Sequence, residues 1–218
     1  MKIKWYGHAA FLITSAQGVK IITDPYESGG FGGAIGYGPI PDEADIVLVS
    51  HDHADHNHVK GLPGKPHVVN GAGAHKAKGF EFTGIPAYHD GSKGSQRGQN
   101  TIFRFDVDGL RFCHLGDLGH VPGEKEAARI GAVDILMIPV GGFYTIDPLE
   151  AGQTIQILRP RISIPMHYKN SKCGFPLASL EEFTNSMTKV RAIEKPEWEI
   201  TKETLPREPE VIVLPPAL

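Results

Sequence analysis

The sequence predicts an α/β fold in which β-sheets are packed between layers of helices. Short runs rich in Val, Ile and Phe recur along the chain and are bounded by Gly, Pro and Asp, which is typical of strands. Helix-start patterns fall between some of these runs and near the carboxyl end. Because 40% of the 218 residues are hydrophobic, the chain can bury a substantial core, and we expect one domain over residues 1–218.

The amino end of the chain begins with strands. KIKWYG and AAFLITS have the alternation of half-buried strands, and KIITDP follows a turn around Gln17 and Gly18, which predicts a small meander. Further strands are predicted at DIVLVS, HVVN, FEFTGIPAYH, NTIFRFDVDG, LRFCHLGD, DILMIPV and RISIPMH. The final segment, residues 194–218, predicts two short edge strands separated by prolines.

Three helices are predicted from their end signals. In DPLEAGQTIQIL, Asp147 is the expected cap, a proline takes the first helical position and Glu150 completes a capping box. In SLEEFTNSM, Ser179 and Glu182 repeat this pattern. The helix predicted at GEKEAARIG ends at Gly131, which is a natural helix stop.

Composition and charge exclude several classes of function. The net charge of -3 comes without a block of Lys or Arg, so we expect neither nucleic acid nor an anionic membrane as a partner, and a small molecule as the substrate. The amino end lacks the apolar core of a signal peptide and no run approaches a membrane span, so we expect a cytoplasmic protein. Cys113 and Cys173 are too few for a disulfide framework and are expected to be structural or surface thiols. The pattern does not decide whether the chain forms a homo-oligomer.

The segment SHDHADHNH carries an unusual density of histidine and aspartate. His51, His53, Asp55 and His56 form the pattern H-x-H-x-D-H at the exit of a predicted strand. Imidazole and carboxylate suit zinc, and also manganese and iron. Because the spacing is close, the first two histidines can hold one ion while Asp55 and His56 reach toward a second. The simpler alternative is a solvated, nonspecific His-rich loop. His58, two residues beyond the pattern, is expected to be solvated or to contact a ligand.

Three other predicted strands end on a residue of the same chemistry. FEFTGIPAYH ends on His89, LRFCHLGD on Asp117 and ISIPMH on His167. Singly, each would more often be a capping or surface residue. Ligands at the same ends of several strands can converge on one cleft. With the four residues of the cluster, these three make seven candidate ligands. Seven ligands are enough for two ions if one carboxylate bridges them.

These motifs together resemble those of the metallo-β-lactamase-fold hydrolases. The resemblance is carried by H-x-H-x-D-H, His89, HLGDLGH and IPMHY, and it runs from WYGHAAFLI through IPMHYK. Within that superfamily, GHAAFLI, ITDP, HLGDLGH and IPVGGFYTIDPLEA are similar to uncharacterised metal-dependent hydrolases related to the L-ascorbate-6-phosphate lactonases. The resemblance implies a four-layer αββα sandwich with the metal site at one edge of the two sheets.

The resemblance also implies an assignment of ligands to two divalent ions, zinc foremost. The first ion would take His51, His53 and His89, the second Asp55, His56 and His167, and Asp117 would bridge them.

Three further residues near these ligands have alternative readings. His114 competes with His89, but strand alternation places residue 114 opposite to 113, 115 and 117, so we favour His89. His8 and Asp24 lie near strand ends and could serve the core or a turn. We favour contacts behind the ligands, because a metal-binding imidazole usually donates its other N–H to a carboxylate such as Asp24.

The expected chemistry is hydrolysis of a small ester, lactone or phosphorylated metabolite. Two bound cations lower the pKa of water so that hydroxide is available to attack at neutral pH. Asp55 and Asp117 are the expected catalytic residues, since they could orient the hydroxide and take up its proton. An oxyanion donor is expected from the backbone of Gly141 or Gly142, or from the Tyr144 hydroxyl, unless VGGFYT is only the turn before a helix.

Two glycine-rich segments, residues 28–39 and 90–100, are either surface loops or substrate-facing loops. In the second, Arg97 and Asn100 could bind an anionic group such as phosphate or carboxylate, or Arg97 could be an exposed arginine without a role.

Three other functions compete with this one. A phosphodiesterase or nuclease of the same superfamily is the main alternative, but it needs a basic path that the sequence lacks. Flavo-di-iron relatives carry a glutamate where this chain has His53 and append a flavin domain. A metal-binding module without catalysis is disfavoured by the complete set of seven ligands.

Overall fold

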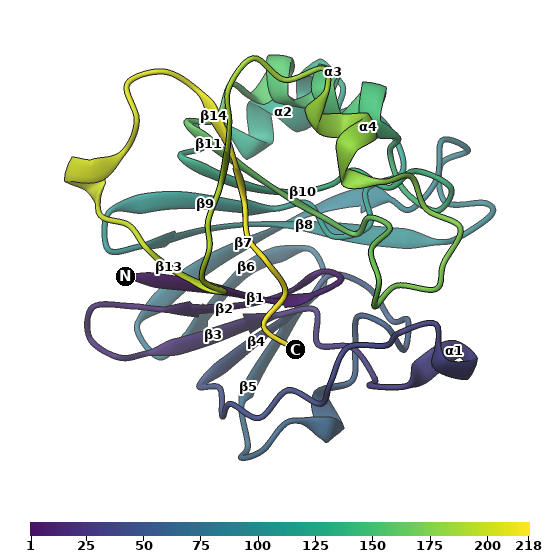
Figure 1. The fold of residues 1–218 in the computed structure, drawn as a ribbon. Coiled ribbons are helices and arrows are strands. Elements are labelled where there is room, and N and C mark those ends of the chain that lie inside the picture. The colour runs from purple at the N-terminus through teal and green to yellow at the C-terminus, as the bar shows by residue number, and fades with distance from the viewer.

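The computed structural model describes residues 1–218 and consists of two β-sheets stacked face to face (Figure 1). The six-stranded sheet has the order β13-β1-β2-β3-β4-β5 and begins with the predicted antiparallel meander, after which β3, β4 and β5 run parallel. Its strands are β1 (Lys2–Gly7), β2 (Ala10–Thr14), β3 (Lys20–Thr23), β4 (Ile46–Val49), β5 (His67–Asn70) and β13 (Glu197–Glu199).

The eight-stranded sheet has the order β12-β14-β11-β10-β9-β8-β7-β6. The strands from β6 to β9 are antiparallel neighbours, and those from β9 through β10, β11 and β14 to β12 are parallel. They are β6 (Gly73–Ala77), β7 (Phe80–Tyr88), β8 (Gln99–Val107), β9 (Leu110–His114), β10 (Ile135–Pro139), β11 (Ile162–Met166), β12 (Val190–Ala192) and β14 (Glu210–Val213).

The carboxyl-terminal segment differs from the expectation of two edge strands. β13 is an edge strand, whereas β14 lies between β11 and β12 inside the eight-stranded sheet. The run VIV explains this position, because a strand inside a parallel sheet is covered on both faces and is mostly apolar, and Glu210 before the run pairs with Lys189 and Arg191. β6 and β12 were not predicted, since GAHKA and VRA contain few large apolar residues.

The three predicted helices are confirmed and lie on the outer face of the eight-stranded sheet (Figure 1). They are α2 (Glu124–Ile130), α3 (Pro148–Leu158) and α4 (Leu180–Thr184). The Asp147 side chain accepts a hydrogen bond from the Glu150 N–H at 2.8 Å, as the capping pattern predicts. The remaining helical segments are the single turns α1 (Gly30–Gly33), η1 (Val59–Gly61) and η2 (Lys202–Thr204). None of the helices has the length and hydropathy that a membrane span requires.

The six-stranded sheet is apolar on both faces. Ile3, Trp5 and Phe11 point into the main core, which is a cluster of 41 buried residues between the sheets and beneath the helices. Tyr6 and Leu12, one position away on the same strands, belong to a second cluster of 13 buried residues on the opposite face. Because successive side chains of a strand alternate between faces, β1 and β2 supply both clusters.

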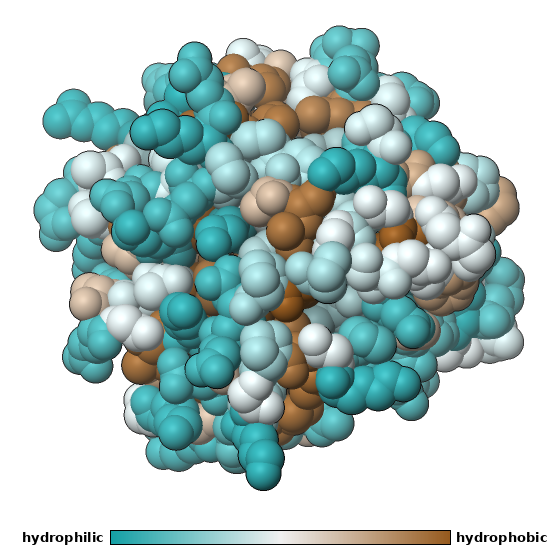
Figure 2. Space-filling model, turned by 60° about the horizontal axis from the view of Figure 1, so that its bottom comes forward, coloured by the Kyte–Doolittle hydropathy of each residue, from teal (hydrophilic) through white to brown (hydrophobic).

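The outer layer over the second cluster is thin. It consists largely of the segment after β3 and the turn η1, which place Tyr26, Ile35, Tyr37, Ile40 and Leu62 against the sheet. Figure 2 views this side of the molecule and shows narrow apolar strips between hydrophilic residues. The four-layer αββα sandwich is therefore confirmed, with one outer layer of three helices and one made mainly of loops.

One edge of the sandwich collects the carboxyl ends of six strands. β1, β3 and β4 point in one direction in their sheet, and so do β7, β9 and β11 in theirs. Two backbone hydrogen bonds join the sheets at this edge, from Thr101 N to Ser50 O at 2.9 Å and from His167 N to His8 O at 3.1 Å. Side chains that follow these strands are consequently brought together.

Candidate metal centre

All seven predicted ligands lie at this edge of the sandwich. His51, His53, Asp55 and His56 follow β4. His89 directly follows β7, Asp117 lies shortly after β9, and His167 directly follows β11. Six of the seven are buried, and the His53 side chain is exposed.

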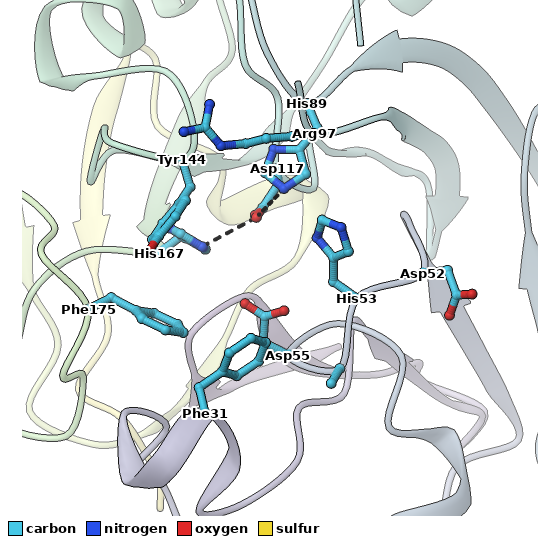
Figure 3. A pocket seen from close by; sticks show the side chains of 11 residues that line it. Phe31, Asp52, His53, Asp55, His89, Arg97, Asp117, Tyr144, His167 and Phe175 are labelled. Carbon is cyan, nitrogen blue, oxygen red and sulfur yellow. Dashed lines mark ion pairs between the residues drawn. The ribbon is translucent and has the colours of Figure 1, made fainter. Parts of the chain in front are cut away.

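The ligand atoms form two groups, which are joined by a third that contains Asp117 with His51 and His56. His51, His53 and His89 make one group, and Asp55, His56 and His167 make another together with His8, with the ligand atoms of each group within 4.8 Å of one another. Figure 3 shows the Asp117 carboxylate between His89 and His167. Its Oδ2 lies 3.3 Å from His89 Nε2 and 3.4 Å from His167 Nε2, and its Oδ1 lies 3.2 Å from His56 Nε2.

Several buried atoms in this centre have no hydrogen-bond partner in the protein. They include His51 Nε2, His56 Nε2 and Asp117 Oδ1. Burying such polar atoms unpaired is costly, and native proteins normally provide a partner. Imidazole nitrogen and carboxylate oxygen are the donor atoms that zinc and similar divalent ions take. The donor set therefore fits a divalent metal.

A buried carboxylate holds these ligands from behind. Asp24 follows β3 and is fully buried, and its Oδ2 accepts hydrogen bonds from His56 Nδ1 at 3.0 Å and from His114 Nε2 at 2.8 Å. The N–H and the hydroxyl of Ser50 both donate to the Asp24 carboxylate at 2.7 Å. Asp24, Ser50, His56 and His114 are called the Asp24 network below.

The Asp24 network orients two ligands. Because His56 Nδ1 is bound to Asp24, His56 Nε2 is left to face Asp117. Ser50 Oγ lies 2.9 Å from His51 Nδ1, which leaves His51 Nε2 for the centre in the same way. Burial alone would raise the pKa of Asp24, but the neighbouring His114 and His56 hold the pKa well below its usual value. His114 thus contacts Asp24 and lies in neither ligand group.

His8 contacts the second ligand group directly. Its Nε2 lies 3.1 Å from Asp55 Oδ2, and its ring lies 4.2 Å from the ring of His167. Burial, reinforced by His167, lowers the pKa of His8 to about 4, so the ring is neutral at pH 7 and can donate an N–H to Asp55. His8, Asp24 and His167 all have positive φ, of 51°, 38° and 53°. Strained backbone of this kind is typical of functional sites.

The charges in the centre oppose one another. Burial, and after it the nearby His56, lower the pKa of His51 to about 3. Burial also lowers the pKa of His56, but Asp117 and Asp55 outweigh it and raise that pKa well above its ordinary value. Burial would raise the pKa of Asp117, whereas His167 and His56 hold it well below its ordinary value. The charged carboxylate of Asp117 therefore faces a protonated His56, while His51 is neutral at pH 7.

A cavity of about 390 Å³ opens over the ligands. Figure 3 shows Asp55, Asp117 and His167 facing into it, with Phe31 and Phe175 on one side and Arg97 and Tyr144 above. The two glycine-rich segments each contribute one of these residues, Phe31 and Arg97. Phe31 and Phe175 were not identified in the sequence, since an isolated phenylalanine gives no signal of its location.

The structure corrects the expectation for Asn100 and removes one of the three candidates for the oxyanion donor. Asn100 cannot serve an anion, because its side chain is buried, accepts from the Asp117 N–H at 3.1 Å and donates to Leu115 O at 2.8 Å. The Gly142 N–H donates to Ile146 O at 3.1 Å and so is not free for an oxyanion. The Gly141 N–H and the Tyr144 hydroxyl remain the predicted donors, and of these two residues Tyr144 lines the cavity.

Comparisons with known proteins agree with this fold and site. The family model described as a beta-lactamase superfamily domain matches residues 2–167. A UPF0173 metal-dependent hydrolase from Carboxydothermus hydrogenoformans is 33% identical and covers 77% of this chain and 84% of its own length. A UPF0173 protein from Pyrococcus abyssi is 30% identical over 95% of this chain and 98% of that protein.

The fold is also similar to solved structures. A candidate Zn-dependent hydrolase of the metallo-β-lactamase superfamily from Thermotoga maritima is 33% identical, covers 98% of this chain and 97% of its own, and superposes with a TM-score of 0.79. The fold and the His/Asp cluster thus define a metal-dependent hydrolase of the metallo-β-lactamase superfamily. Within that superfamily, the chain belongs to the UPF0173 metal-dependent hydrolase family.

Proposed function

We propose that this enzyme uses two divalent ions, zinc foremost, to hydrolyse a small ester, lactone or phosphorylated metabolite. The observation that carries the proposal is the position of Asp117, whose two carboxylate oxygens lie within 3.4 Å of histidines from both ligand groups. His51, His53 and His89 would hold one ion, and Asp55, His56 and His167 the other. Manganese and iron suit the same ligands.

The residues of the chain have distinct roles in the proposed reaction. Bound divalent ions would supply an activated water and polarise the bond to be cleaved. Asp55 and Asp117 orient that water, and Asp55 is itself held through Oδ2 by His8 Nε2. The Tyr144 hydroxyl is proposed to donate to the oxyanion. One water is consumed, and for an ester the products are an acid and an alcohol.

A small substrate is favoured over a polynucleotide. The cavity volume of about 390 Å³ suits a small molecule. Arg97 is the one Lys or Arg among the residues that line this cavity and the adjoining cleft, so a nucleic-acid backbone would meet little positive charge. The lactonase resemblance of the sequence supports an ester or lactone by analogy. We therefore propose a small-molecule substrate in the cytoplasm, with neither nucleic acid nor a membrane as partner.

The proposal is tested by metal content and activity together. Protein purified without a chelator or affinity tag is analysed for bound elements beside Asp117→Ala and a control variant, Asp134→Ala. Asp134 is also a buried carboxylate, but it pairs with Arg111 away from the ligands. All three proteins are assayed on ester, lactone, thioester and phosphodiester panels.

We expect about two ions per chain, their loss in Asp117→Ala alone, and activity that follows the metal. One ion with full activity would reject the binuclear arrangement. Folded protein that neither binds metal nor hydrolyses any panel member would reject the function.

A further inference from the structure

Two hollows of opposite chemistry meet over the ligand residues. The cavity of about 390 Å³ has an aromatic wall formed by Phe31, Tyr144 and Phe175. An adjoining polar cleft of about 610 Å³ is lined by residues such as Asn70, Gln99 and Thr101. The residues common to both hollows are Asp52, His53 and Arg97. A substrate that lies across the ligands would therefore meet apolar surface at one end and polar groups at the other.

The Arg97 guanidinium is positioned without an anionic partner. It lies 5.5 Å from the centre of the Tyr144 ring, a cation–π contact that holds the long side chain in place (Figure 3). Its neighbours in the two hollows include Asp52 and Asp117, yet it forms an ion pair with neither. A half-buried guanidinium beside a cleft is suited to bind a phosphate or carboxylate with two parallel hydrogen bonds.

The loop that carries Arg97 is rigidly built. The Asp90 carboxylate accepts four backbone hydrogen bonds, from the N–H groups of Ser92, Gly94, Gln96 and Arg97, at 2.7 to 3.0 Å. Gly94 has φ of 78°, and a Cβ there would lie 2.7 Å from Gly98 O, so the tight turn requires glycine. Asp90 directly follows the predicted ligand His89, so the same strand end fixes both the centre and the arginine.

The aromatic side of the cavity carries exposed phenylalanines in strained backbone. Phe31 is 53% exposed with φ of 53°, and Phe143 is 63% exposed with φ of 59°. Their rings are connected through Phe175 and Tyr144, with successive ring centres 4.7 to 5.6 Å apart. Left-handed backbone disfavours a bulky residue, and exposure removes the gain from burial. Neither backbone preference nor burial therefore explains a phenylalanine at these two positions, whereas contact with an apolar ligand does.

We propose that the enzyme acts on amphiphilic substrates in which the scissile bond joins an apolar group to an anionic head. The apolar group packs on the aromatic wall, and a phosphate or carboxylate of the head binds Arg97 where the polar cleft begins. Asp90 acts as a positioning residue for Arg97. This inference rests on the hydrolysis proposed above, because the bond to be cleaved is placed over the ligand residues.

A matched panel of esters tests the two halves separately. Each ester has a hexanoyl or an acetyl group, and an alcohol that carries a phosphate, a carboxylate or no charge. With metal-loaded enzyme, we expect the highest kcat/KM for a charged hexanoyl ester, and comparison of the two charged heads identifies the anion. Arg97→Gln should lower kcat/KM for the charged esters by about tenfold or more, mainly through KM.

The aromatic half is tested by Phe31→Gly with Lys78→Gly as its control. Lys78 is also exposed and has φ of 50°, but it lies in the turn between β6 and β7. Both changes relieve left-handed strain, so both should leave the melting temperature unchanged or raised. Only Phe31→Gly should reduce the preference for hexanoyl over acetyl esters. Equal losses on both ester lengths would overturn the aromatic half of the proposal.

A binding measurement separates this inference from the hydrolysis itself. Amide analogues of the same panel are titrated into metal-loaded protein by calorimetry, since they bind without rapid turnover. If metal-dependent hydrolysis is absent but the charged hexanoyl amide binds most tightly and loses that advantage in Arg97→Gln, the proposed function fails and the recognition stands. If charged and uncharged analogues bind alike, or Arg97→Gln weakens both equally, the recognition is rejected whatever the activity.

Discussion

The back and the rim of the candidate centre are built in different ways. The back is the Asp24 network, which is fixed by buried hydrogen bonds and strand ends. The rim is formed by loop residues such as Phe31, Arg97 and Tyr144. Arg97 contacts the Tyr144 ring directly, and Phe31 is linked to Tyr144 through Phe175. The contrast teaches that one half of the site is organised to hold ligands in place, while the other is available to select what reaches them.

The largest effect is expected at Asp24. Asp24→Asn removes a buried charge that faces His56 and His114, so we expect about 3 to 5 kcal/mol of lost stability. We also expect metal affinity to fall by about 10- to 100-fold, because His56 loses the partner that orients it. Chemical unfolding and elemental analysis measure the two effects.

Asp134→Asn is the control for this change. It also removes a buried carboxylate, which the Arg111 side chain contacts at 2.8 and 2.9 Å, and it should cost stability without loss of metal. If Asp24→Asn keeps metal as tightly as this control does, the back of the centre does not support the ligands.

A smaller loss of stability is expected at Asn100, in the segment 97–100 that also carries the rim residue Arg97. Asn100→Ala leaves the Asp117 N–H and Leu115 O without their partner, so we expect a loss of about 1 to 3 kcal/mol and weaker metal binding. Arg97→Ala, three residues away, should keep stability and metal content. Unfolding curves and metal analysis of both variants measure these effects. Equal stability and equal metal content in the two variants would contradict the different roles of Asn100 and Arg97.

The pH dependence of metal affinity sharpens the same contrast. Burial lowers the pKa of His56, but Asp117 and Asp55 raise it well above 6.5 in the metal-free protein. The protonated ring therefore stabilises the metal-free fold fully below pH 6.5, and this contribution is lost as the pH rises through the folded pKa. A metal must displace that proton, so its affinity should rise with pH.

We expect release of about one proton from His56 on metal binding at pH 7, and about a tenfold gain in affinity per pH unit below the folded pKa. Calorimetry in buffers of different ionisation enthalpy measures the proton. Identical heats in all buffers would contradict the expectation.

The smallest effect is expected beyond the rim, at the cap of α3. Asp147→Ala removes the acceptor for the Glu150 N–H and should cost about 1 kcal/mol. Metal content should not change, since Asp147 contacts no predicted ligand. Urea unfolding measures the loss of stability, and elemental analysis measures the metal content. A loss of metal in this variant would mean that the helical layer and the metal centre are coupled.

Much of the ligand set in front of this back was predictable because its signals are local. The H-x-H-x-D-H pattern contains four predicted ligands, and His89, Asp117 and His167 each come shortly after an apolar strand that the sequence shows directly. The role of Ser50 was missed, although its position directly before His51 at a strand end was a usable signal. Whether these residues bind metal stays a prediction of their chemistry.

The rim was less predictable because its roles depend on contacts between distant segments. Both Arg97 and Asn100 were predicted to bind an anionic group. The Asn100 side chain instead points inward and binds the loop of Asp117, whereas Arg97 lines the cavity. Phe31 contacts Phe175 across most of the chain, and nothing near Phe31 in the sequence indicates that partner. Similarly, β14 became an interior strand through pairing with β12, a short segment without a clear apolar pattern.

The bond from His167 N to His8 O has a consequence for how the protein is made. On the ribosome, the histidines after β4 emerge well before β11, so a nascent chain presents part of the ligand set in an unfinished sandwich. Ligands from one turn alone hold an ion weakly, because a preformed site is lacking. Tight metal loading must therefore wait until residue 167 has emerged and closed against the first strand. A chain that lacks its last third would therefore keep part of the predicted ligand set but hold metal only weakly.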